Sequence, residues 1–152
     1  MNYEASNTRK GTLFEDEVEK ALADTYGYRF NREVGIGIGS PPKRHRFDLV
    51  DPNTKTVVEC KALTWTSSGN MPSAKITTTR EAVFYLQWLP EEWTKIVAMS
   101  RSLRFGYDES LAEYFVRLNG HLLGDVRVIE VDGGEARMLQ GTLARSLPKS
   151  LA

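Results

Sequence analysis

Cysteine is almost absent from this chain of 152 residues, in which Cys60 stands alone. A single cysteine excludes an internal disulfide framework, and that pattern is typical of proteins kept in a reducing compartment. It also excludes a zinc site built from several cysteines. No apolar run approaches the ~18 residues that span a membrane, and the N-terminal stretch lacks the apolar segment of a secretory signal. We therefore expect a cytoplasmic protein with no membrane partner.

An excess of charge of either sign is missing too. The chain has 20 Lys and Arg against 20 Asp and Glu, so its formal net charge is zero. Zero net charge gives no general support for nucleic-acid binding, which usually goes with a basic surface. Any basic surface would have to be local. The length fits one domain over residues 1–152, and we expect its core at about 10–132 and an uncertain tail at 133–152.

Hydrophobic spacing predicts three helices and five strands. The helices are expected at residues 12–26, 77–89 and 108–120, and the strands at 28–39, 45–50, 56–63, 94–100 and 125–131. The order α-β-β-β-α-β-α-β favours a three-layer α/β fold, in which helices flank a central mixed sheet. The β-α-β step around the second helix implies a parallel pair of strands.

Helix ends are predicted from capping residues. Thr12 followed by Glu15, and Thr78 followed by Glu81, fit the capping-box pattern, and Asp108 is the expected cap of the third helix. The second helix is apolar around most of its circumference, so we expect it to be largely buried. Tyr85 and Trp88 in this helix, and Trp93 after it, are interpreted as structural.

The stretch VVECK at residues 57–61 places two opposite charges in an apolar strand. Side chains alternate along a strand, so Glu59 and Lys61 lie on the same face. Burying them is costly unless they are paired or bind something. A charged residue in an otherwise apolar strand is therefore a candidate for function.

Asp48 on the preceding strand is the expected partner of Glu59. It should point away from the core if Phe47 and Leu49 fill it. Adjacent strands lie about 4.8 Å apart, so Asp48 and Glu59 converge if they share a face. Two close carboxylates repel and favour a shared divalent cation, and hard oxygen ligands suit Mg²⁺. Lys61, about 7 Å along its strand, can reach a water or a phosphate oxygen there.

Asp48, ten intervening residues and then Glu59-Cys60-Lys61 resemble the motif of the PD-(D/E)XK nuclease superfamily. The predicted helix, three strands, helix and strand are similar to that superfamily's restriction-endonuclease-like core, and the resemblance covers roughly residues 10–100. Glu15 in the first helix resembles a further acid of these enzymes. Phe47 stands where the motif has proline, which is not needed for metal binding.

The resemblance implies a Mg²⁺-dependent DNA endonuclease in which Mn²⁺ can replace Mg²⁺. Asp48, Glu59 and the backbone carbonyl of Cys60 would bind the metal. Lys61 would orient or deprotonate the attacking water and steady charge on the phosphate, and Glu15 would bind a second metal or a water of the metal's shell. Such enzymes often act as homodimers, so the third helix and the fifth strand are candidate dimer surfaces.

Basic and aromatic residues near the motif are candidates for DNA contact. The expected contacts are Lys43, Arg44 and Arg46 before the Asp48 strand, Lys75 and Arg80 near the second helix, and Trp65 in the loop 64–74. Each has a structural alternative. The basic run fits an ordinary solvated loop, the two helix residues fit a solvated helix surface, and Trp65 fits a side chain that covers the core.

Structural alternatives exist for the acidic residues as well. Glu59 and Lys61 fit the solvated face of an edge strand, Asp48 fits a brace for the turn at residues 51–55, and Glu15 fits a helix cap. A non-catalytic nucleic-acid-binding or protein-binding module of the same fold is the alternative function, favoured by the zero net charge. A metal-free RNA nuclease would need a histidine, tyrosine and lysine together, and no such trio is readable.

Overall fold

The computed structural model describes residues 3–143, with side chains from residue 9 onward. The elements are α1 (Tyr3–Tyr26), β1 (Asn31–Ile38), β2 (Lys43–Asp51), β3 (Thr56–Lys61), α2 (Ser73–Gln87), β4 (Thr94–Ser100), α3 (Leu111–Asn119), the 3₁₀ helix η1 (Gly120–Leu122), β5 (Arg127–Asp132) and β6 (Glu135–Gln140). None of these described helices combines the length and apolar character that a membrane span requires.

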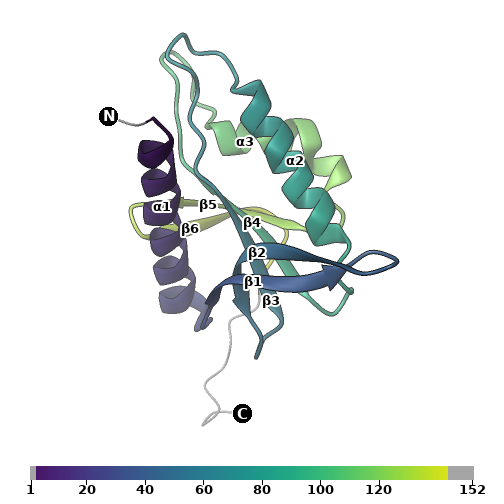
Figure 1. Ribbon diagram of the computed structural model, residues 1–152. Coiled ribbons are helices and arrows are strands. Elements are labelled where there is room, and N and C mark those ends of the chain that lie inside the picture. The colour runs from purple at the N-terminus through teal and green to yellow at the C-terminus, as the bar shows by residue number, and fades with distance from the viewer. Residues whose placement is uncertain (1–2, 144–152) are drawn as a thin grey trace.

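The six strands form one mixed sheet in which spatial order follows chain order, from β1 to β6. The β3–β4 and β4–β5 pairs are parallel, and the other pairs are antiparallel. Two successive crossovers in the same direction bring α2 and α3 to one face, and α1 covers the other (Figure 1). The expected α/β class, with helices flanking a central mixed sheet, is confirmed.

Two hydrophobic clusters lie on opposite faces of this sheet. Under α2 and α3 the core includes Val57 and Phe115, and under α1 it includes Val58 and Phe14. Consecutive residues of β3 thus supply both cores, as alternation along a strand requires. β3 is an internal strand between β2 and β4.

Helix α1 begins nine residues earlier than expected. It starts at Tyr3 rather than Thr12, so Thr12 and Glu15 lie inside the helix and the predicted capping box there is wrong. Ser and Thr mark a helix start only when the preceding residues leave the helix, and here the polar residues before Thr12 continue it. The end at Gly27 is confirmed, with φ +77° and its N–H on the Ala23 carbonyl at 2.9 Å.

The capping predictions for the other helices are also wrong. Helix α2 begins at Ser73, and the Thr78 hydroxyl donates within the helix to the Lys75 carbonyl at 2.8 Å. In α3 the cap is Ser110, which forms a capping box with Glu113, rather than Asp108. Several residues in each stretch have cap-forming side chains, and tertiary packing selects among them.

Helix α2 buries only one face, contrary to expectation. Leu86 is buried, whereas Phe84 is 56% exposed and Trp88 is 52% exposed. An apolar composition does not tell how much of a helix its neighbours cover, and α2 lies on the outside of the sheet.

The strand β6 falls in the tail that sequence patterns left uncertain. It pairs with β5 through a turn at Gly133 and Gly134, whose φ angles are +57° and +81°. Two adjacent glycines in the left-handed region are the hairpin signal that predicts such a strand. β5 is consequently an internal strand and not a free dimer surface. Residues 144–152 of the expected tail lie outside the described part of the chain.

Candidate active site

Strands β2 and β3 separate at Asp48. Their ladder runs over Leu49–Val58, Val50–Val57 and Asp51–Thr56. Beyond it, β2 stays in register with β1, and β3 stays in register with β4 as far as Lys61. The next residues in the β2–β3 register are Asp48 and Glu59. We call the opening at Asp48, Glu59 and Cys60 the β2–β3 fork.

The two carboxylates fill this fork. The Cys60 N–H donates to Asp48 Oδ2 at 2.8 Å, and the Asp48 N–H donates to Glu59 Oε1 at 3.2 Å. Each carboxylate accepts a hydrogen bond from a backbone N–H group beyond the end of the ladder. These two N–H groups therefore keep a hydrogen-bond partner where the strands separate. The predicted convergence of Asp48 and Glu59 is thus present in the structure.

The side-chain alternation of β2 changes at this point. Phe47 belongs to the core under α2 and α3, whereas Leu49 belongs to the core under α1. The expectation that both fill the core on one face is therefore wrong. Glu33 of β1, which the register would place opposite Asp48, has a left-handed φ of +49°, and the pairing of β1 with β2 is interrupted there. Asp48 lies where the strand rotates.

Burial and mutual repulsion dominate the electrostatics of the fork. Glu59 is 7% exposed, and burial followed by the Asp48 charge raises its pKa to about 8, while Lys61 acts in the opposite direction. Burial and the same carboxylates raise the pKa of the Cys60 thiol well above its ordinary value. Near neutral pH the pair therefore holds a proton.

Lys61 and His45 lie beside the carboxylates. Alternation along β3 gives Lys61 the face of Glu59, and Cys60 packs on the opposite side against the core under α1. The pKa of His45 is lowered by burial and, to a smaller extent, by the Lys61 charge, whereas the Asp48 charge acts in the opposite direction. His45 is therefore close enough to respond to both charges. His45 was missed in the sequence. Its position three residues before Asp48 was visible, but its packing against α2 was not.

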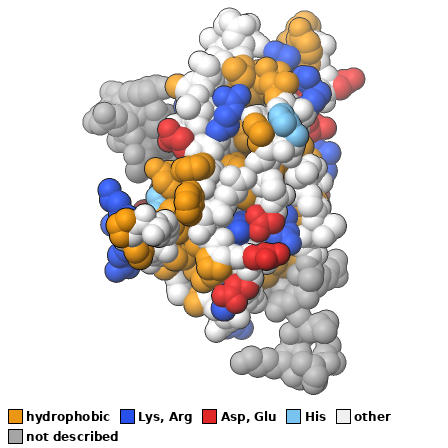
Figure 2. Space-filling model, turned by 90° about the vertical axis from the view of Figure 1, so that its right-hand side faces the viewer, with side chains coloured by type: hydrophobic (Ala, Val, Ile, Leu, Met, Phe, Trp, Pro, Cys, Tyr) orange, Lys and Arg blue, Asp and Glu red, His pale blue; other side chains and the backbone are white. Residues whose placement is uncertain are grey.

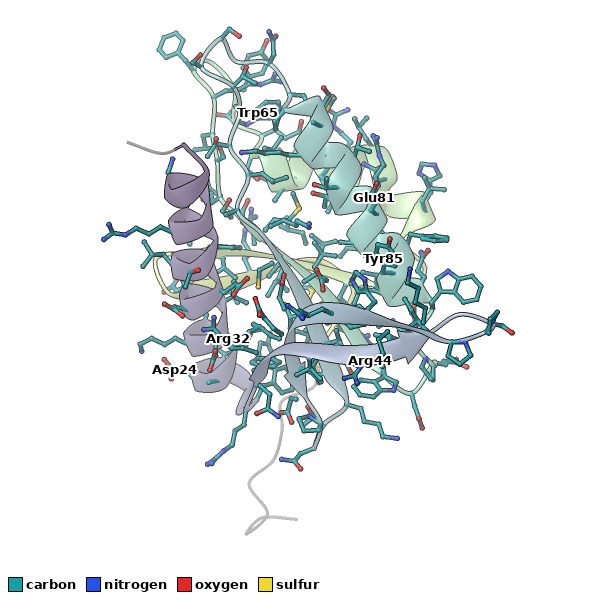
Figure 3. The ribbon with its side chains drawn as sticks, in the orientation of Figure 1. Asp24, Arg32, Arg44, Trp65, Glu81 and Tyr85 are labelled. Atoms are coloured by element: carbon teal, nitrogen blue, oxygen red, sulfur yellow. The ribbon has the colours of Figure 1, made fainter. Side chains whose placement is uncertain are left out.

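Glu15 reaches the fork from α1. Burial and the Asp48 charge raise its pKa, and Arg32 opposes this from 3.2 Å. Arg32 of β1, which Figure 3 labels, also contacts Asp16 at 2.7 Å and pairs with Glu19. Glu15 is therefore held by an arginine on the side of the fork next to α1.

A complete metal site is not preformed. Within residues 9–143, no three His, Cys, Asp or Glu side chains gather closely enough to hold a metal ion. Asp48 and Glu59 converge, and Glu15 is engaged by Arg32. The donors that fit one Mg²⁺ are the two carboxylates and the Cys60 carbonyl, which are the hard oxygens this ion prefers. Water would have to complete its coordination.

The structural alternatives for the acidic residues do not hold. The turn after β2 is braced by Asp51, which accepts from the N–H groups of Asn53 at 2.9 Å and Thr54 at 3.3 Å, so Asp48 does not have that role. β3 is internal and Glu59 is buried, so Glu59 is not on the solvated face of an edge strand.

The basic run belongs to strand β2 rather than to a loop before it. Lys43, Arg44 and Arg46 are all exposed. The Arg44 Nη2 donates to the Gly35 carbonyl at 3.3 Å, and the Arg46 guanidinium lies 3.8 Å from the Glu33 carboxylate. These cations are therefore arranged along the β1–β2 hairpin.

The other predicted DNA contacts lie apart from the fork. Lys75 and Arg80 are exposed on α2, and Arg80 Nε donates to the Asn119 side chain of α3 at 2.9 Å. Trp65 is 7% exposed, and its indole N–H donates to the Ser102 carbonyl at 3.0 Å. The Arg104 guanidinium lies 3.9 Å above its ring. This leaves little of the Trp65 ring for stacking on a base.

No protein-family model matches the chain, and no curated protein or solved structure is significantly similar to it. Function therefore has to be inferred from the residues at the β2–β3 fork.

Proposed function

We propose that the protein is a Mg²⁺-dependent DNA endonuclease. The observation that carries this proposal is the fork itself, in which Glu59 meets the Asp48 carboxylate, and burial followed by the Asp48 charge raises the pKa of Glu59 to about 8. A fold gains no stability from such repulsion, so a cation that relieves it is the simplest explanation. Lys61 follows on the face of Glu59 and supplies the positive group that phosphate chemistry uses.

The chain's own groups divide the work as follows. Asp48, Glu59 and the Cys60 carbonyl hold the cation, which when bound lowers the pKa of water and neutralises charge on the phosphate. The Lys61 ammonium orients the attacking water and donates to a phosphate oxygen. Water attacks phosphorus as the bond to the 3′ oxygen breaks, which leaves 5′-phosphate and 3′-hydroxyl ends. Once its ion pair with Arg32 is broken, Glu15 contacts a water molecule in the coordination shell of the cation.

The order of elements supports the resemblance on which the proposal also draws. A helix, three antiparallel strands, a helix and a parallel strand run from α1 to β4, which is the order of a restriction-endonuclease-like core. The carboxylates lie on its second and third strands, as the PD-(D/E)XK motif requires.

The proposal extends to a homodimer, because cutting both strands needs two active sites. The candidate surface is the outside of α3 and η1, where Leu118 is 40% exposed and Leu122 is 60% exposed. Gel filtration with light scattering should give twice the monomer mass. A monomer at all concentrations would contradict this part of the proposal.

Cleavage of supercoiled plasmid and branched DNA tests the activity. We expect nicking with Mg²⁺ or Mn²⁺ and none with EDTA. Asp48→Asn, Glu59→Gln and Lys61→Met should each lower the rate by about 100-fold or more, which is the usual size for loss of a metal ligand or a charge-stabilising group. Glu91→Gln and Lys20→Met change an exposed carboxylate and an exposed lysine elsewhere, so they should cut at the wild-type rate.

A non-catalytic binding module is the second candidate. It is favoured by the Arg32 contact to Glu15 and by the incomplete metal site among the described residues. Calorimetric titration with Mn²⁺ distinguishes the two functions. Binding that Asp48→Asn abolishes supports the nuclease. DNA binding without metal binding or cleavage supports the module.

A further inference from the structure

The β1–β2 hairpin leaves a groove beside α2 that the proposed reaction does not use. Beyond the fork the hairpin lies against the C-terminal half of α2 (Figure 1). The hairpin groove between them has a volume of about 350 Å³. The residues that define its chemistry are Lys43, Arg44 and His45 on the hairpin and Phe84, Tyr85 and Trp88 on α2. Figure 3 labels Arg44 and Tyr85 at this end of the molecule.

Exposed aromatic rings form one wall of the hairpin groove. Phe84 and Trp88 are more than half exposed and meet edge to face, with ring centroids 6.2 Å apart. Tyr85 is backed by the His45 ring, which stacks on it at a centroid distance of 4.1 Å and an angle of 17°. Single exposed apolar side chains are ordinary, but a cluster of rings around a hollow is typical of a binding surface.

Positive charge lines the opposite wall. Of the described residues that line the hairpin groove, none is acidic, whereas Lys43 and Arg44 are basic. Lys43 shares the face of His45, which stacks on Tyr85 of α2. The Arg44 guanidinium lies across Gly35 on the opposite face of the hairpin, because Ile36 and Ile38 turn toward the core under α2. Figure 2 shows orange side chains gathered beside a blue group at the left of the view. Rings for bases and cations for phosphates are the combination that binds single-stranded nucleic acid.

The hairpin groove and the candidate active site share strand β2. His45 lines the groove and also responds to the charges of Asp48 and Lys61. Asp48 lies three positions after His45 on β2, which corresponds to about 10 Å along a strand. A DNA strand that passes through the fork would therefore meet the groove within a short distance.

We propose that the hairpin groove binds an unpaired nucleotide of the DNA strand that enters the fork. The base stacks on Trp88 and Phe84, and its phosphate contacts Lys43. This inference rests on the proposed nuclease function and narrows its substrate to DNA with an unpaired strand, such as a flap, a fork or a single strand. A fully paired duplex keeps its bases stacked inside and cannot place one on the rings.

Fluorescence anisotropy in EDTA tests the groove without cleavage. The probes are a fluorescein-labelled single strand of 12 thymidines, a blunt duplex and the same duplex with a thymidine flap. We expect the single strand and the flap to bind about tenfold more tightly than the blunt duplex. Trp88→Ala should lose about tenfold in affinity for the flap, the usual size of one stacked base. Lys43→Ala should also weaken flap binding and should reduce its dependence on salt.

Matched variants make the test specific. Phe105→Ala removes a fully exposed ring on a different loop, and Lys20→Ala removes an exposed cation elsewhere. These controls should bind the flap as the wild type does. Equal losses in the controls, or equal affinity of the wild type for flap and blunt duplex, would overturn the proposal. Light scattering tests whether a second copy of the chain occupies the groove instead of a nucleotide. A dimer that Trp88→Ala dissociates would assign the groove to that second copy and would also overturn the proposal.

Cleavage assays in Mg²⁺ separate this inference from the function on which it rests. Preferential flap binding in EDTA without any cleavage would retain the groove and overturn the nuclease. Cleavage of flap and blunt duplex at equal rates, with no effect of Trp88→Ala, would retain the nuclease and overturn the groove. Preferential cleavage near the flap, lost on Trp88→Ala, supports both.

Discussion

Glu59 and Glu130 are two buried glutamates in one sheet with opposite surroundings. Glu130 on β5 is 2% exposed and accepts from Arg101 at 3.0 Å, from Arg137 at 2.8 Å and from the Ser110 hydroxyl. Glu59 on β3 accepts a backbone N–H and faces the Asp48 carboxylate. One carboxylate is fully compensated by the protein, whereas the other is placed against a second negative group.

The difference separates a structural acid from a candidate functional one. Glu130 fastens the loop after β4, the start of α3 and strand β6 to the sheet, because its partners come from these three segments. Removing its charge would leave several donors without an acceptor. Glu59 braces one backbone group and carries an electrostatic cost, so its compensation has to come from a proton or from a cation supplied by solvent.

The free energy of unfolding of two variants should distinguish the roles of Glu130 and Glu59. Glu130→Ala is expected to lower the free energy of unfolding by about 2–4 kcal/mol, because the buried Ser110 hydroxyl and the Arg101 guanidinium lose this acceptor. Glu59→Gln should leave stability unchanged or raise it, because it removes a repulsion. Urea denaturation at neutral pH measures both. A larger loss for Glu59→Gln than for Glu130→Ala would reverse the assignment.

The second-largest expected effect is the pH dependence of the stability of the metal-free protein. Glu59 has a pKa of about 8 when folded and an ordinary value of 4.5, so the folded state binds the extra proton between those values. Stability should therefore fall as pH rises from about 5.5 to 8.5, at up to about 1.4 kcal/mol per pH unit for this group. Urea denaturation across that window measures it. Glu59→Gln should show a flatter profile, and equal slopes would exclude Glu59 as the cause.

Divalent cations should stabilise the protein through the fork. At a Mn²⁺ concentration ten times its dissociation constant, the gain is about 1.4 kcal/mol, and thermal unfolding should shift upward accordingly. The shift should be larger at pH 8 than at pH 6, because the cation replaces a proton. Asp48→Asn should abolish it. Sodium chloride at matched ionic strength is the control, and an equal shift with sodium would attribute the effect to general screening.

The smallest expected effect concerns Arg32 of β1 and the carboxylates of α1 that it contacts. Arg32 compensates Glu15 as Arg101 and Arg137 compensate Glu130, but its side chain is 33% exposed. Arg32→Met should therefore cost only about 1 kcal/mol, and less at high salt. Arg117→Met, which breaks an exposed pair with Glu109, is the matched control. Chemical denaturation at two salt concentrations tests it, and a salt-independent loss would indicate lost packing instead.

Much of the sheet was predictable because long patterns carry it. The bounds of β4 at Thr94 and Ser100 were correct, and the convergence of Asp48 with Glu59 followed from strand register alone. Shorter signals failed. Thr12 and Asp108 have the side chains of caps, but the chain is already helical at Thr12 and Ser110 caps the third helix instead of Asp108. A cap signal covers a few residues, so tertiary packing easily outweighs it.

The rest of the site depends on contacts that no local pattern contains. His45 joins the fork because it packs on Tyr85 of α2, and these residues lie forty positions apart in the chain. Arg32 engages Glu15 only because β1 lies next to α1. The exposure of Trp88 likewise depends on where α2 ends relative to the hairpin. The sequence predicted the acidic pair, and tertiary structure determined what surrounds it.

The agreement between strand order and chain order has a consequence for how the molecule forms. Every strand is hydrogen-bonded to the strand that follows it in the chain, from β1 to β6. Each addition to the sheet therefore closes only the loop or helix just synthesised, and the entropy lost at each step stays small. After β2 pairs with β3, the two crossovers add β4 and then β5 to the same edge of the sheet. We expect rapid refolding without a slow search for distant partners.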